Sequence, residues 1–323
     1  MSTKPTTASI LIAGAGQLGS RYLQGLAKCR PPLAVWVQDI HEASLVRAKQ
    51  RWEEVLGSET RHAVSFHASF ESLPRQFDIA IVSTNADVRP QVVGKIASHS
   101  AVRFWILEKV LAQSESGLDE IQVHVGGGSG AWVNTLRRML PWHQQIKSRL
   151  GLEHPLTLNV DGGKWGLACN AVHFLDLLAW WTGETLQEVN TDRLSEHWFE
   201  GKRPGNWEVL GTLDARFSGG SRALLCAGEG EARYSMTVND RDRSWRVDEE
   251  EGIARRSDGI EIPGRIPYQS EISADLVETI LESGRCDLPT LAESAAIHRV
   301  FIHGMQEHWK RMVDPAATSV PIT

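Results

Sequence analysis

The first 125 or so residues alternate between short apolar runs and amphipathic stretches of helical period. Each apolar run is typical of a strand buried on both faces of a parallel sheet, and the runs cover residues 9–13, 33–37, 63–66, 79–82 and 104–107. Residues 20–27 place several apolar side chains on one side of a helix, and residues 89–97 predict another. Alternating strands and helices predict an α/β fold with a doubly wound parallel sheet, a Rossmann domain.

The pattern changes after the glycine-rich segment 126–130. Apolar and polar residues then alternate between turn signals, which is typical of an antiparallel meander, over residues 156–160, 209–217, 222–226 and 234–238. Helices are predicted at 171–182, which ends at Gly183, and at 291–311. We therefore expect two domains, a Rossmann domain over 1–128 and an α+β domain with a mainly antiparallel open sheet over 129–323.

A glycine motif lies between the first predicted strand and the first predicted helix. Gly14, Gly16 and Gly19 fit the pattern GxGxxG, with Gln17 and Leu18 between the last two. Gly14 permits the tight turn, Gly16 lets the backbone approach a pyrophosphate, and Gly19 lets the helix pack closely on the strand. The N–H groups and the dipole of the helix N-terminus then favour an anion. These five residues are candidates for dinucleotide binding; a tight turn without a ligand is the alternative.

Asp39 strengthens the dinucleotide interpretation and bears on the choice of cofactor. It closes the second predicted strand, 20 residues after Gly19, where a carboxylate can accept hydrogen bonds from the adenosine ribose hydroxyls. Its charge would repel a 2′-phosphate, and no arginine follows in the next three positions. We expect NAD as the cofactor in preference to NADP. The alternative for Asp39 alone is a solvated acid at a strand end.

Composition and charge exclude several other classes of protein. The chain of 323 residues carries 34 Lys and Arg against 40 Asp and Glu, a net charge of −6, so it lacks the positive field that nucleic acid or an anionic membrane surface requires. The most apolar stretch, 171–181, is about half as long as a membrane-spanning helix. The polar N-terminus lacks the features of a secretion signal. Four scattered cysteines without a CxxC pair indicate neither a disulfide scaffold nor a metal site. We expect a cytoplasmic protein without a metal.

Two residues outside the glycine motif are candidates for chemistry. Lys109 follows the strand at 104–107, and the carboxyl ends of parallel strands are where such sheets bind ligands. Asn170 is a natural N-cap, which would place His173 in the first turn of a buried helix. There the dipole and desolvation would keep the imidazole neutral, as a general base requires. The alternatives are an exposed Lys109 paired with Glu108, and a core histidine bonded to backbone or to Asp176.

Several segments together resemble the Gfo/Idh/MocA oxidoreductases, named after glucose-fructose oxidoreductase, inositol dehydrogenase and the rhizopine-catabolism protein. The segments are GAGQLGSRY at the start, EKV at 108–110, the pair Arg137 and Arg138, HFLDLLAWWTG at 173–183 and LPTLAESAAIHRV at 288–300. The resemblance implies hydride transfer between a nicotinamide and a hydroxyl or carbonyl carbon of a sugar, sugar derivative or cyclitol. It also implies a homodimer or homotetramer assembled through the sheet of the second domain.

The resemblance also assigns roles to individual residues. Lys109 corresponds to the lysine that polarises the reacting oxygen, and His173 to the histidine that transfers the proton. Many members carry an aspartate four residues before that histidine, where this chain has Cys169 beside Asn170. The implied substrate-binding residues are Lys109, Trp165, Cys169, Asn170 and His173. Further cofactor contacts are implied for Ser83, Thr84, Asn85 and Glu108.

The hypothesis that follows is an NAD-dependent dehydrogenase in which His173 removes the hydroxyl proton while Lys109 stabilises the oxygen. Two alternatives stay open: a glycoside hydrolase that uses NAD on the same scaffold, and an NAD-binding or sensing protein without catalysis. Trp165, Trp198 and Trp207 fall in turn-like segments where a sugar could stack, although tryptophans more often fill a core. Asp176 is interpreted as structural, because a buried acid needs a partner. The acidic run 248–251 is interpreted as a solvated turn.

Overall fold

The computed structural model describes residues 7–55, 61–126, 130–241 and 243–323. The chain forms two compact units that each combine several segments. The first unit comprises Met1–Glu108, Asp119–Asn134 and Pro267–Leu291, and the second comprises Lys109–Leu118, Thr135–Ile266 and Ala292–Thr323. The sequence predicts a single division at residue 128 instead. It misses that a C-terminal segment returns to the first unit, and the predicted boundary segment falls partly outside the described residues.

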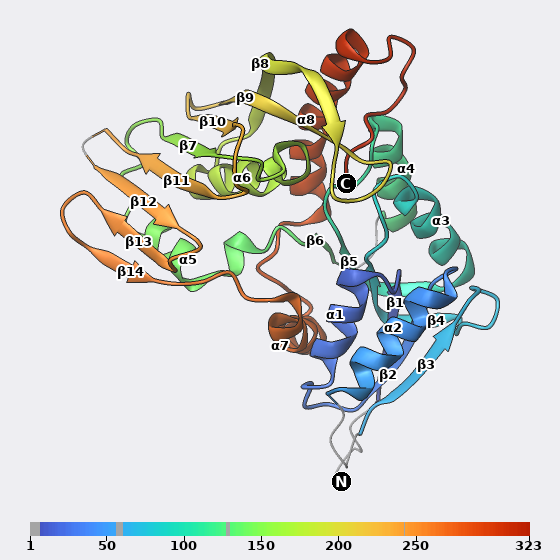
Figure 1. The fold of residues 1–323 in the computed structure, drawn as a ribbon. Helices are drawn as coiled ribbons and strands as arrows, with labels where there is room; N and C mark the ends of the chain where they lie inside the picture. The colour runs from blue at the N-terminus through green and yellow to red at the C-terminus, as the bar shows by residue number, and fades with distance from the viewer. Residues whose placement is uncertain (1–6, 56–60, 127–129, 242) are drawn as a thin grey trace. The chain divides into compact units, whose positions relative to one another are not determined.

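The first unit contains a parallel six-stranded sheet in the order β3-β2-β1-β4-β5-β6 (Figure 1). This is the strand order of the Rossmann fold. The strands are β1 (Ala8–Ala13), β2 (Leu33–Gln38), β3 (Ala63–His67), β4 (Gln76–Val82), β5 (Ala101–Leu107) and β6 (Ala131–Val133). Most of the apolar residues of β1, β4 and β5 are fully buried, because helices of a doubly wound fold cover both faces. The predicted Rossmann sheet is confirmed.

Helices connect these strands, and one helix joins them from far along the chain. The connecting helices are α1 (Gln17–Leu26), α2 (Glu42–Glu53), α3 (Arg89–His99) and α4 (Glu115–Val125). Helix α7 (Gln269–Ser283) packs beside α1 (Figure 1). The close approach depends on Gly25, since a Cβ there would lie 2.8 Å from the Cβ of Ser273. An amphipathic pattern in α7 alone could not reveal which unit the helix joins.

The second unit is built on an eight-stranded sheet in the order β14-β13-β12-β11-β7-β10-β9-β8. Only the pair β7 and β10 is parallel in this sheet, and the other neighbours are antiparallel. The strands are β7 (Thr157–Gly162), β8 (Leu186–Glu200), β9 (Trp207–Phe217), β10 (Arg222–Ala227), β11 (Tyr234–Asn239), β12 (Ser244–Asp248), β13 (Ile253–Arg256) and β14 (Glu261–Pro263). The predicted α+β architecture is confirmed.

Helix α6 (Leu167–Thr182) covers part of this sheet through contacts with β9 and β10. It is apolar nearly all round, and its Phe174 and Trp181 are fully buried. Helix α8 (Leu291–Met312) packs on β8, where a Cβ on Gly304 would lie 3.1 Å from Val189. The short helices η1 (Leu136–Met139) and α5 (Pro141–Lys147) complete the elements. Among the described residues, no helix is long and apolar enough to cross a membrane.

Candidate functional site

The glycine turn between β1 and α1 has the geometry that dinucleotide binding requires. Gly14 adopts a φ of +92°, which L side chains rarely adopt, and a Cβ there would lie 2.9 Å from the backbone nitrogen of Thr84. A Cβ on Gly19 would lie 1.8 Å from the carbonyl oxygen of Gly14, so only glycine lets the helix pack against the turn. Gly16 differs, because a Cβ there would meet no protein atom within 4 Å. Gly16 is also the N-cap of α1 and supplies no side-chain cap.

Asp39 lies beside this turn, as the sequence predicts. Its Oδ2 accepts a hydrogen bond from the backbone nitrogen of Ala15 at 2.7 Å, and its Oδ1 accepts one from the backbone nitrogen of His41 at 2.8 Å. A carboxylate oxygen can accept two hydrogen bonds, so both oxygens keep capacity for ribose hydroxyls. The first turn of α1 also contacts α2, because the Arg51 guanidinium donates to Gln17 Oε1 at 2.6 Å.

The segment after β4, residues 83–85, lies next to the glycine turn. The Ser83 hydroxyl donates to the carbonyl oxygen of Gly14 at 2.7 Å. Thr84 lies against Gly14, and its buried Oγ1 has no hydrogen-bond partner among the described residues. Asn85 is exposed, and its carbonyl oxygen accepts the first backbone hydrogen bond of α3, from the nitrogen of Arg89 at 3.1 Å. Ser83 and Thr84 therefore adjoin the glycine turn, and Thr84 keeps a free hydroxyl there.

Glu108 is buried in a polar network of the first unit instead of being exposed at a strand end. Its Oε1 accepts hydrogen bonds from the Tyr22 hydroxyl at 2.6 Å and from Asn134 Nδ2 at 2.7 Å. Asn134 Nδ2 also lies 2.8 Å from Gln269 Oε1, which ties the network to α7. Burial, followed by the neighbouring Glu108, raises the pKa of Tyr22 well above its ordinary value. Glu108 is thus buried, whereas the alternative for Lys109 expects an exposed pair.

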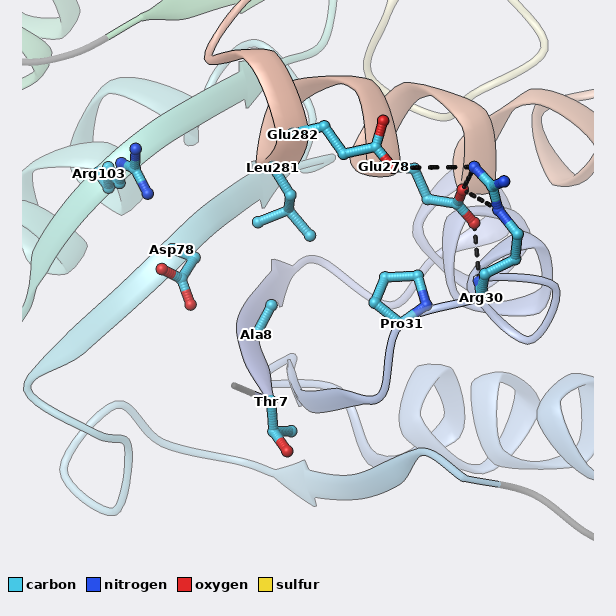
Figure 2. Close-up of a pocket in the computed structure, with 9 residues that line it drawn as sticks. All are labelled: Thr7, Ala8, Arg30, Pro31, Asp78, Arg103, Glu278, Leu281 and Glu282. Carbon is cyan, nitrogen blue, oxygen red and sulfur yellow. Dashed lines mark hydrogen bonds and ion pairs between the residues drawn. The ribbon is translucent and has the colours of Figure 1, made fainter. Parts of the chain in front are cut away.

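The first unit has one cavity beside α3 and α4 and another at the amino ends of its strands. One, of about 780 Å³, is lined by Gln38 and Ile40 after β2, by residues of the segment 68–75 after β3, and by residues of α3 and α4. The other, of about 510 Å³, lies at the amino ends of β1, β4 and β5, where Figure 2 shows Arg30 paired with Glu278. Ligands of open α/β sheets bind outside the carboxyl ends of the strands. Neither cavity is lined by a residue that the sequence assigns to the cofactor.

Lys109 points to the beginning of α6 within the second unit. Its Nζ donates to the carbonyl oxygen of Cys169 at 3.0 Å and lies 3.4 Å from both Cys169 Sγ and Asn170 Oδ1. The structure thus brings together three of the residues that the sequence assigns to the substrate. Asn170 is held in turn by a hydrogen bond from its Nδ2 to the carbonyl oxygen of Trp165 at 2.9 Å.

The prediction that Asn170 caps the helix is wrong. Helix α6 begins at Leu167, and its N-cap is Gly166 with a φ of +79°. The cap comes from Glu208 on β9, whose Oε2 accepts from the nitrogen of Ala168 at 2.8 Å and whose Oε1 accepts from that of Cys169 at 3.2 Å. Burial raises the pKa of Glu208 to about 7 despite these hydrogen bonds and the charge of Lys109. No local sequence signal identifies a cap that lies 40 residues away.

His173 therefore lies inside α6, beyond its first turn. Burial lowers the pKa of its imidazole well below the ordinary value, and the positive charges of Arg137 and Lys109 lower it further. The predicted neutral ring agrees with this direction, and desolvation is its main cause as predicted, but the second cause is nearby cations and not the helix terminus. Its buried Nδ1 has no hydrogen-bond partner in the described residues. The predicted alternative of a bond to Asp176 is not formed, because Arg138 binds Asp176 through Nε at 2.8 Å and Nη2 at 2.7 Å.

A cavity of about 530 Å³ lies within the second unit at the beginning of α6, and neither Lys109 nor His173 is among its lining residues. Trp165, Cys169 and Asn170 line it together with Trp207 and Glu208. The remaining lining residues are Lys164, Gly166, Phe199, Glu200, Gly201, Lys202, Arg203, Asn206, Ala232 and Thr323. The sequence identifies the first three residues but misses the contribution of β8, β9 and the segment between them.

The three tryptophans singled out by sequence differ in their surroundings. Trp165 is buried and packs edge-on against Phe174, and its Nε1 donates to the carbonyl oxygen of Cys226 at 2.8 Å. Trp198 packs against Trp309 in the core, away from the lining of the cavity. Trp207 is half-buried and lines the cavity. Only Trp165 and Trp207 can therefore contact a ligand there.

One acid of the run 248–251 is buried, so the predicted solvated turn is wrong at that position. Glu249 forms a bidentate pair with Arg137, with both contacts at 2.8 Å, and accepts from the Tyr234 hydroxyl. These interactions lower the pKa of Glu249 well below its ordinary value despite its burial. Arg137 in turn stacks on the ring of Phe174, next to His173 in the chain. Among the described residues, no group of three or more His, Cys, Asp or Glu side chains could hold a metal ion.

Comparison with known proteins extends the description of the fold. No protein-family model and no curated protein matches the sequence. Several solved structures nevertheless match over nearly the whole chain. A protein from Desulfitobacterium hafniense, proposed to be an NADPH-dependent oxidoreductase, has a TM-score of 0.70 at 12% identity over 95% of this chain and 97% of its own.

Two further solved structures match this chain over a similar length. The myo-inositol dehydrogenase of Lactobacillus casei, solved with NAD(H) and myo-inositol, has a TM-score of 0.67 at 11% identity over 95% of this chain and 96% of its own. A super-repressor mutant of Gal80p from Saccharomyces cerevisiae has a TM-score of 0.67 at 12% identity over 94% and 96%. The chain thus has the fold that its resemblance to the Gfo/Idh/MocA oxidoreductases implies.

Proposed function

We propose that this protein is an NAD-dependent oxidoreductase that acts on a hydroxyl or carbonyl carbon of a sugar, sugar derivative or cyclitol. The observation that carries the proposal is the glycine turn of the first unit, where Gly16 leaves the N-terminus of α1 open beside the Asp39 carboxylate. Structures of the same fold support it, since the myo-inositol dehydrogenase of Lactobacillus casei was solved with NAD(H) and its polyol.

The residues of the first unit fit an adenine dinucleotide. Gly14, Gly16 and Gly19 would hold the pyrophosphate against the N–H groups of α1, and the Asp39 oxygens would accept the ribose hydroxyls. The buried hydroxyl of Thr84 has spare hydrogen-bonding capacity at the same turn. NAD would supply the hydride acceptor for the reaction. The negative charge of Asp39 favours NAD over NADP, whose 2′-phosphate it would repel.

The residues of the second unit fit proton transfer at a hydroxyl. A neutral His173 can take the hydroxyl proton, because burial and nearby cations disfavour its protonated form. The Lys109 ammonium would stabilise the negative charge that develops on the oxygen, while Asn170 and Cys169 hold its Nζ in place. The cavity lined by Trp165, Cys169 and Asn170 would bind the rest of the substrate.

Two experiments test the proposal and separate it from its alternatives. The first incubates the protein with NAD and a panel of sugars and cyclitols and follows the absorbance of reduced nicotinamide. Accumulation of reduced cofactor supports the dehydrogenase; product release without it indicates the NAD-using hydrolase. The second measures thermal shifts with NAD and with each polyol, because a ligand that binds the folded state stabilises it. NAD binding without turnover of any polyol would indicate a sensing protein instead.

A further inference from the structure

Glu208 holds a carboxylate inside the cavity of the second unit, in a place that helix capping alone does not require. Caps are usually supplied by a short side chain just before the helix, at a solvated surface. Here the N-cap is Gly166, and the carboxylate comes from β9, where Glu208 is half-buried. Burying a carboxylate is costly, and that cost is what raises the pKa of Glu208 to about 7.

The surroundings of Glu208 place it with the residues proposed to bind substrate. A Cβ on Gly166 would lie 3.1 Å from Asn170 Nδ2 and 3.2 Å from Glu208 Oε1, so the amide and the carboxylate flank the same glycine. Asn170 Oδ1 lies 3.4 Å from Lys109 Nζ. An acceptor, an amide and a cation are therefore grouped at the beginning of α6.

The carboxylate of Glu208 keeps unused hydrogen-bonding capacity. Each oxygen accepts one backbone N–H of α6, and a carboxylate oxygen can accept two hydrogen bonds. The carboxylate lines the cavity, whose volume of about 530 Å³ lies in the range of small-molecule sites. Trp207, the neighbour of Glu208 on β9, lines the same cavity with an aromatic side chain. Adjacent hydroxyls on a ring match a carboxylate beside an aromatic face.

We propose that Glu208 is the substrate-binding carboxylate of this cavity and accepts hydrogen bonds from adjacent hydroxyls of a ring polyol. The inference rests on the proposed function and assigns a residue to substrate recognition that neither the glycine motif nor the resemblance indicates. Glu208 then has two roles, since the same carboxylate caps the first turn of α6 and accepts hydrogen bonds from the polyol. Its replacement should weaken polyol binding and leave the dinucleotide site of the first unit intact.

The test compares the wild type with Glu208→Gln and with a matched control, Glu184→Gln. Glu184 also accepts a backbone N–H through its carboxylate, from Gly219 at 2.7 Å, but it does not line the cavity. Binding of glucose, myo-inositol and NAD is measured by calorimetry, together with KM and kcat for any polyol that is oxidised. The unfolding temperature and NAD affinity of each variant establish that it is folded.

We expect Glu208→Gln to weaken polyol binding by about tenfold or more, because an amide replaces a charged acceptor, while kcat and NAD affinity change less. Glu184→Gln should leave polyol affinity unchanged. In the wild type, polyol affinity should rise as pH increases from 6 to 8, and Glu208→Gln should remove that rise. Other charged side chains near Glu208 can also change polyol affinity with pH: Lys109, Lys164, Glu200, Lys202 and Arg203. The readout is therefore the difference in pH dependence between the wild type and Glu208→Gln.

Equal polyol affinity in wild type and Glu208→Gln would overturn the inference, and so would a wild type that binds NAD but neither polyol. Hydride transfer with an unchanged KM in the variant would leave the oxidoreductase standing and remove Glu208 from recognition. Polyol binding that depends on Glu208, without hydride transfer, would support the inference and refute the oxidoreductase.

Discussion

The N-termini of α1 and α6 differ in whether a side chain of the protein binds their backbone N–H groups. Each has backbone N–H groups that find no partner within the helix, and each carries the positive end of a helix dipole. At α1 the cap is Gly16, no side-chain cap is formed among the described residues, and a Cβ on Gly16 would meet no protein atom within 4 Å. At α6 the cap is again a glycine, but the Glu208 carboxylate accepts the hydrogen bonds of two N–H groups.

The N-terminus of α1 is therefore free to bind an external anion, whereas the N–H groups at the N-terminus of α6 already bind a carboxylate of the chain. The open terminus of α1 suits a pyrophosphate that arrives with the cofactor. The satisfied terminus of α6 instead gives a fixed frame for Lys109, Cys169 and Asn170. On this account, changes in the first unit should act on cofactor affinity, and changes at α6 should act on turnover and substrate affinity.

The largest expected effect is on turnover when the proposed base is removed. His173→Ala should lower kcat by about 100-fold or more, because no other described group is proposed to take the hydroxyl proton. NAD affinity, measured by titration, should not change. His303→Ala is the control, since His303 is exposed on α8. Turnover within twofold of the wild type in His173→Ala would remove His173 from the mechanism.

The second prediction concerns Lys109 and its electrostatic effect on His173. Lys109→Met keeps the length of the side chain but removes the charge that stabilises the reacting oxygen, so kcat should fall by about tenfold to 100-fold. The charge of Lys109 also lowers the pKa of His173. Its loss should therefore raise that pKa and move the acidic limb of the rate profile to higher pH. A limb that stays in place would mean that His173 does not control it.

A smaller effect is expected on cofactor choice. Asp39→Ser removes the carboxylate that would bind the ribose hydroxyls and repel a 2′-phosphate. NAD affinity should fall by about tenfold, and the ratio of NADP affinity to NAD affinity should rise. Titrations with both cofactors measure this ratio. If the ratio is unchanged, Asp39 is a structural acid of the turn and the preference for NAD has another origin.

The smallest predicted effect is on stability and follows from the pKa of Glu208. The folded protein raises this pKa from its ordinary 4.5 to about 7, so between those values the folded state binds more protons than the unfolded chain. The contribution of Glu208 to stability is therefore lost as pH rises through about 7. Glu208→Gln lacks this loss. Its unfolding temperature relative to the wild type should increase from pH 5 to pH 8, and a constant difference would contradict the raised pKa.

The sequence reveals features that are local and misses those that depend on distant segments. The turn at Gly14, Gly16 and Gly19 could be predicted because its strand, loop and helix are consecutive in the chain. Asp39 could be placed because the second strand of a Rossmann sheet pairs with the first. By contrast, Glu208 meets Ala168 only after β9 has paired within the second sheet. A natural cap residue, Asn170, gave a wrong helix start for that reason.

Burial of charge is the other property that local patterns could not reveal. Glu249 lies in a run of four acids, which is typical of a solvated turn, yet it pairs with Arg137 in the interior. Helix α7 packs in the first unit where Gly25 admits Ser273, although these two residues are 248 positions apart in the chain. In both cases the partner lies far along the chain, and only the tertiary structure identifies it.

Titration of the wild type and of Gly16→Val with NAD is the decisive test of the dinucleotide site at the glycine turn. A Cβ at Gly16 would meet no protein atom within 4 Å, so the variant should fold with an unchanged unfolding temperature. We predict saturable binding of NAD to the wild type and affinity weaker by about 100-fold in Gly16→Val, whose side chain fills the space left for the pyrophosphate. No detectable binding of either oxidised or reduced cofactor to the wild type, or equal affinity in the two proteins, would contradict the account.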